Sequence, residues 1–237
     1  MISSGKNCSR RSSANSLPGA IRRTAALLAT LIAAACACFA QTGKVESIGA
    51  VSDPSVSAAV RNSLEPHGYK ITLPDGSVVA EVWLRQELPS SGNKDVRGAV
   101  YPQFAESTLL GVISFPAAAT DYRGEPIKAG AYTMRYELLP DDGNHLGVAP
   151  NRDFLLLIPA ASDTDPTSVY KFDQLVKLSS QATGTRHPAP MSMAPAQGAE
   201  LPAITLNQDQ NWVFSAKVRV GPEDIPFGLI VKGTAAQ

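Results

Sequence analysis

Residues 126–159 constrain the fold more than any other part of the chain. From position 132 to position 138, apolar residues occupy every even position and polar residues every odd one. This period of two is typical of a half-buried β-strand. After a polar loop over residues 141–152, the chain continues as an apolar run over 154–158, which predicts a strand buried on both faces. The stretch therefore predicts a β-rich core.

The rest of the chain adds further short strands and two helices. Strands are expected at 69–73 and 77–85, joined by the turn Pro74-Asp75-Gly76, and again at 108–115, 212–220 and 227–232. One helix is expected to begin at Asp53-Pro54, and a second to cover 167–180 with its cap at 163–166. Residues 181–203 are rich in Pro, Ala and Gly and predict an extended connecting loop. About seven to eight strands with two short accessory helices predict a mostly β fold, an antiparallel β-sandwich, in a single domain over residues 41–237.

Residues 1–40 have the composition of a signal peptide. They carry five basic residues and no acidic one, and end in a weakly apolar, alanine-rich run followed by small residues. This pattern predicts export with cleavage before Gln41, and therefore a periplasmic or secreted protein with no membrane span after cleavage. The alternative is a lipid anchor through Cys36 or Cys38.

Charge and cysteine content exclude several classes of function. Five of the 21 basic residues and none of the 21 acidic residues lie in the first forty positions, so residues 41–237 carry a net charge of about −5. An acidic chain without a basic cluster is not typical of a nucleic-acid-binding protein. All three cysteines also precede position 41, so disulfides and thiol catalysis are not expected in the exported chain.

The densest polar loop contains a candidate ligand site. Carboxylate, amide and imidazole groups at the edge of a sheet can bind a polar ligand or a metal, although Asp, Gly and Asn are also the commonest turn residues. The candidate residues are Asp142, Asn144, His145, Arg152 and Asp153.

A second candidate is a metal site in the Pro-rich segment. His187, Met191 and Met193 lie within seven residues, and imidazole with thioether ligands selects Cu(I) in an exported protein. The alternative is that the methionines fill gaps in the core.

The chain resembles one family in a single turn. Residues 127–134 read IKAGAYTM, which resembles the K-A-G-x-Y-T turn of uncharacterised exported bacterial β-sandwich proteins, the DUF2911-like proteins. The resemblance covers about a tenth of the exported chain and implies fold and export. It carries over no functional residues.

These observations predict a non-catalytic binding or accessory β-sandwich of the bacterial envelope, with a small ligand, a glycan or an envelope protein as its partner. The first alternative is a periplasmic Cu(I)-binding protein. The second is a hydrolase with a dispersed carboxylate site at Glu137, Asp142 and Asp153, because residues distant in sequence can assemble an active site.

Overall fold

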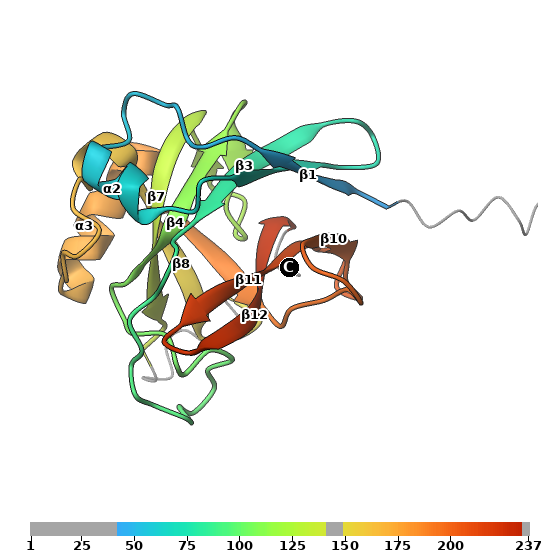
Figure 1. Ribbon diagram of the computed structural model, residues 1–237. Coiled ribbons are helices and arrows are strands. Elements are labelled where there is room, and N and C mark those ends of the chain that lie inside the picture. Colours follow the sequence, from blue (N-terminus) through green and yellow to red (C-terminus); the bar gives the residue numbers. More distant parts are fainter. Residues whose placement is uncertain (1–41, 141–148, 234–237) are drawn as a thin grey trace, which may run out of the picture. The chain divides into compact units, whose positions relative to one another are not determined.

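Ten antiparallel strands form one continuous sheet in the computed structural model, which describes residues 42–140 and 149–233 (Figure 1). The predicted signal peptide lies outside the described residues, and Thr42–Gln237 is a compact unit. In spatial order, the strands are β1 (Lys44–Ile48), β2 (Gly68–Thr72), β3 (Val78–Leu84), β4 (Leu109–Phe115), β7 (Gly130–Leu138), β8 (Asp153–Pro159), β9 (Pro190–Ala194), β12 (Glu223–Lys232), β11 (Trp212–Val220) and β10 (Ala203–Leu206).

The sheet curls until its first and last strands approach each other. A Cβ atom built on Gly43, just before β1, would lie 2.8 Å from Cγ2 of Ile204 in β10. The inner face of the curl is filled by alternate residues of the strands, because successive side chains of a strand point to opposite faces. This inner cluster includes Ala80, Val82, Tyr132, Met134, Tyr136, Leu155, Leu157, Phe214, Ala216, Phe227 and Leu229.

Two helices cover parts of the outer face. Helix α2 (Ala58–Ser63) brings Val60 against Trp83 of β3, whose indole Nε1 donates to Gly49 O at 2.8 Å. Helix α3 (Phe172–Thr183) packs Leu175 against Leu156 of β8. Two minor strands, β5 (Ala119–Thr120) and β6 (Pro126–Ile127), pair separately, and Ala160–Ser162 form a 3-10 turn. Among the described residues, no helix combines the length and apolarity needed to cross a membrane.

The mostly β, antiparallel character with two helices is confirmed, but the number and arrangement of strands differ from the prediction. The seven strands read from periodicity are all present. Strands β1, β9 and β10 join them in one sheet, whereas seven or eight strands in two layers were expected. The additional strands are only four or five residues long, too short to show a clear alternation.

Both predicted helix starts are wrong. Asp53 accepts a hydrogen bond from Ser55 N in a turn, and α2 begins later, where Ser57 Oγ accepts from Val60 N at 3.1 Å. Asp163 does not begin α3: its carboxylate binds Arg135, and α3 begins nine residues further along at Phe172.

The predicted loop over 181–203 contains a strand that joins two parts of the sheet. The first half of β9 pairs with β8, with Ser192 opposite Phe154, and its second half pairs with β12, with Ala194 opposite Gly228. The three C-terminal strands are therefore attached to the rest of the sheet through β9. Proline, alanine and serine obscure its alternation in the sequence.

Candidate functional site

The predicted polar-loop site is represented by two residues, because Asp142, Asn144 and His145 lie outside the described residues. Asp153 is 0% exposed, and its carboxylate accepts hydrogen bonds from Val100 N (2.6 Å), Tyr101 N (2.9 Å) and the Tyr136 hydroxyl (2.8 Å). Arg152 donates from Nε to Leu139 O and from Nη1 to a second carbonyl, both at 2.7 Å. Both side chains therefore hold neighbouring backbone segments together.

The three candidate copper ligands do not share one environment. His187 is exposed, whereas Met191 and Met193 are buried in the inner cluster. Met193 is 0% exposed, so its thioether already has core neighbours. The structure thus places the methionines in packing roles and does not bring them to the surface with His187. In the described ranges, no group of three or more His, Cys, Asp or Glu side chains is arranged to hold a metal ion.

The carboxylates of the dispersed-site alternative do not converge among the described residues. Glu137 is paired with Phe154 and faces outward, whereas Asp153 is paired with Leu138 and reaches the inward-facing Tyr136. The two carboxylates therefore lie on opposite faces of the sheet. The third residue, Asp142, lies outside the described residues.

Glu137 is nonetheless an unusual residue. Burial, the largest cause, and the negative charge of Glu106 together raise its pKa to about 7, against the lowering effect of the Leu138 and Ser107 backbone N–H groups. A carboxyl group with this pKa exchanges its proton near neutral pH. Its place on the outer face makes it a contributor to pH-dependent stability rather than part of an assembled site.

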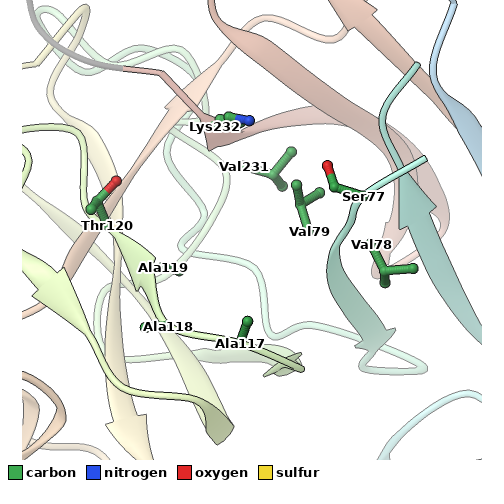
Figure 2. Close-up of a pocket in the computed structure, with 9 residues that line it drawn as sticks. All are labelled: Ser77, Val78, Val79, Ala117, Ala118, Ala119, Thr120, Val231 and Lys232. Atoms are coloured by element: carbon green, nitrogen blue, oxygen red, sulfur yellow. The ribbon is translucent and has the colours of Figure 1, made fainter. Parts of the chain in front are cut away.

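A hollow formed by described residues at one end of the curled sheet could hold a small ligand. It has a volume of about 300 Å³ and lies between three segments: the start of β3, the connection from β4 through β5, and the end of β12. Figure 2 shows these segments facing one another across it. Its lining residues are Ser77, Val78, Val79, Ala117, Ala118, Ala119, Thr120, Val231 and Lys232. Six of these nine residues are valine or alanine, and the other three add two hydroxyls and an ammonium group.

A second hollow, of about 340 Å³, adjoins the first and shares Thr120 and Lys232 with it. Its other lining residues come from the β10–β11 turn, the start of β11 and the residue after β12: Asp209, Gln210, Trp212 and Gly233. The two hollows together are called the Lys232 groove. The first is its apolar half and the second is its polar half.

Sequence reasoning did not find the Lys232 groove. Its residues come from segments up to about 150 positions apart, and Ala117, Ala118 and Ala119 carry no chemical signal by themselves. The one local signal is the run Asp209-Gln210-Asn211-Trp212, a polar turn directly followed by one of the two tryptophans.

Comparison with known proteins gives no further guidance, because no protein-family model, no curated protein and no solved structure matches this chain. The resemblance of residues 127–134 to the DUF2911-like proteins therefore stays a prediction.

Proposed function

We propose that this chain is an exported, non-catalytic binding protein of the bacterial envelope, and that its small ligand occupies the Lys232 groove. The groove carries this proposal. A mostly apolar lining with a few polar groups is the usual composition of a small-ligand site, and volumes of a few hundred Å³ are typical.

The supports of the groove favour a site that is already formed without ligand. Val79 and Val231 belong to β3 and β12, two strands of the main sheet, and both pack in or against the inner cluster. A wall made by strands holds its geometry better than one made by loops alone. Little ordering is then required on binding, which favours affinity.

The non-catalytic part of the proposal is supported by what the carboxylates do. Asp153 accepts three hydrogen bonds from its own fold, and Glu137 lies on the opposite face of the sheet from it. Neither is a lining residue of the Lys232 groove.

Thermal melts of the purified protein against a panel of sugars, amino acids, short peptides and fatty acids test the binding site. A ligand at 100 times its Kd adds about 2.7 kcal/mol to the free energy of unfolding. The decisive variant is Ala118→Trp, because Ala118 is exposed and lines the apolar half, so the indole would occupy the groove without entering the core. Ala59→Trp, at an exposed position of helix α2, is the matched control.

We expect at least one compound to raise the Tm of the wild type and of Ala59→Trp, and to have little effect on Ala118→Trp. A panel without any stabilising compound, or one in which Ala118→Trp in the apolar half and Gln210→Ala in the polar half both respond like the wild type, would overturn the proposed site.

Export is tested separately by expressing the full chain in a Gram-negative host and sequencing the N-terminus of the periplasmic protein. We expect the first residue to be Gln41. A cytoplasmic protein with an intact N-terminus would contradict export and leave the binding test unaffected.

A further inference from the structure

The polar half of the Lys232 groove has an available tryptophan ring in its wall. The chain has two tryptophans, and Trp83 is buried with its indole N–H bonded to Gly49. Trp212 is half-buried, packs against the inner cluster and lines the polar half. A flat, partly exposed indole supported from behind by the core provides a rigid apolar surface on which another ring can stack.

The groups around Trp212 offer both donors and acceptors without a strong positive field. Asp209 contributes a carboxylate, Gln210 an amide, Thr120 a hydroxyl and Lys232 an ammonium group. Lys232 also lies close enough to Asp75 to affect its carboxyl group. The hydrogen bonds from Ser77 are the main cause that lowers the pKa of Asp75, and the positive charge of Lys232 lowers it further. One carboxylate in the lining and a second carboxylate near the single ammonium group disfavour an anionic ligand such as a phosphate.

A buried amide without hydrogen bonds lies next to the polar half. Asn211 is 1% exposed, and in the described part of the chain neither its Oδ1 nor its Nδ2 has a hydrogen-bond partner. It stands between Gln210 and Trp212 in the chain and packs against Gly233, since a Cβ atom on that glycine would lie 2.0 Å from Asn211 Oδ1. Asn211 does not line the hollow, so its amide belongs to the packing between this turn and Gly233.

The backbone of the same turn is also in a conformation that ordinary residues avoid. Gln210 has a φ of 60°, and in the described ranges Ser107 is the only other non-glycine residue with a positive φ. Such conformations concentrate at binding and active sites, where the surrounding structure imposes them. Here the turn is closed by Gln210 N donating to Asn207 O and Asn211 N donating to Asn207 Oδ1, which fixes Gln210 at the rim of the groove.

From the ring and the mixed polar groups around it, we infer that the polar half binds a neutral saccharide, with a sugar ring stacked on Trp212. The hydroxyls of a sugar supply donors and acceptors to Asp209, Gln210 and Lys232, and its C–H face suits the indole. The inference rests on the proposed function and specifies the ligand class of the same groove.

The test is calorimetric titration of the purified protein with cellotriose, maltotriose and N,N′,N″-triacetylchitotriose, with trigalacturonic acid as the anionic comparison. We expect at least one neutral trisaccharide to bind and to change the tryptophan emission. Trp212→Ala should weaken its binding about tenfold or more, and Trp212→Phe, which keeps a flat ring, by less than about threefold. Gln210→Ala alters an exposed side chain and should weaken binding about threefold, which keeps the test valid even if Trp212→Ala unfolds.

Three outcomes would overturn the inference. No neutral trisaccharide binds, or binding is unchanged in both Gln210→Ala and Trp212→Ala, or trigalacturonic acid binds as strongly as the neutral trisaccharides. If a compound that is not a sugar binds and Ala118→Trp blocks it, the saccharide inference fails while the proposed function stands. If no compound of any class binds, both fail.

Discussion

Arg135 and Asp163 form a two-pronged ion pair that is completely buried. Arg135 Nε donates to Asp163 Oδ2 and Nη2 donates to Oδ1, both at 2.7 Å, and both side chains are 0% exposed. The remaining three guanidinium N–H groups donate to backbone carbonyl oxygens, those of Ser107, Ser168 and Asp165. All five donors of the arginine are therefore satisfied within the fold, and the pair fixes the 163–168 segment on the outer face of β7.

Asp163→Ala should strongly destabilise the protein. The substitution leaves a buried guanidinium without its counter-charge, which costs about 3–5 kcal/mol in comparable pairs. The free energy of unfolding from urea denaturation measures the effect. The matched control is Asp224→Ala, whose ion pair with Arg219 has a separation of 3.4 Å and is more than half exposed, so its loss should cost less than about 1 kcal/mol. Similar losses in the two variants would contradict the role assigned to the buried pair.

Glu137 should make the stability of the protein depend on pH. Its pKa is about 7 in the folded protein, above the ordinary value of 4.5, so between these values the folded state binds a proton that the unfolded chain releases. The free energy of unfolding therefore decreases as pH rises from about 4.5 to about 7, and Glu137→Gln should remove this decrease. Urea denaturation at pH 4.5, 5.5, 6.5 and 7.5 provides the measurement.

Glu106→Gln is the control for the cause of this shift. Burial is its first cause, and the charge of Glu106 is the second, so removing that charge should reduce the pH dependence without abolishing it. Parallel stability profiles of the wild type and Glu137→Gln would show that Glu137 titrates in its ordinary range.

Asp153→Ala should lower the stability of the protein. The substitution leaves the Val100 and Tyr101 N–H groups without their acceptor, at about 1–3 kcal/mol for each group that stays unpaired, and the Tyr136 hydroxyl keeps only Tyr101 O, at 3.1 Å. We expect a loss of about 3 kcal/mol or more in a urea melt. Asp95→Ala, in an exposed part of the loop between β3 and β4, should be close to neutral. An Asp153→Ala variant as stable as the wild type would show that these donors find other partners.

Met193→Ala should destabilise the core, and His187→Ala should not. Met193 is fully buried in the inner cluster, and truncating such a residue costs about 2–5 kcal/mol, whereas His187 is exposed. Thermal melts compare the two variants. A Cu(I) titration of the wild type and His187→Ala completes the experiment, and copper affinity that is lost in His187→Ala would restore the metal-site alternative.

Gln210→Gly should raise the stability of the protein and weaken the binding of its proposed ligand. Glycine adopts the φ of 60° without the cost that glutamine bears, which is of order 1 kcal/mol. The expected rise in Tm is a few degrees. Gln208→Gly, at an exposed position in the same turn, is the control and should not raise the Tm. A lower Tm for Gln210→Gly would show that the glutamine side chain itself stabilises the turn.

The strands could be predicted because their evidence is local. Tyr132, Met134 and Tyr136 alternate with polar residues, and the structure places all three in the inner cluster. The turn at Gly76 could also be predicted from the sequence, and its φ of 82° in the structure is a conformation that suits glycine. The same reasoning misassigned Asp163, because a residue that often caps a helix is here bound by an arginine 28 positions earlier.

Two features needed the tertiary structure: the position of β9 and the Lys232 groove. Met191 and Met193 resembled potential metal ligands in sequence, and pairing with β8 and β12 turned them into core residues.

By itself, the sequence determined where the chain extends, which face of each long strand is apolar, and that the fold is mostly β. Those properties follow from side-chain periodicity within a few residues. Only the tertiary structure decided that the sheet curls until its first and last strands approach each other and that Thr120, Trp212 and Lys232 line one groove. The physical reason is that a site of this kind depends on which distant segments come into contact, and a pattern within a few residues does not predict those contacts.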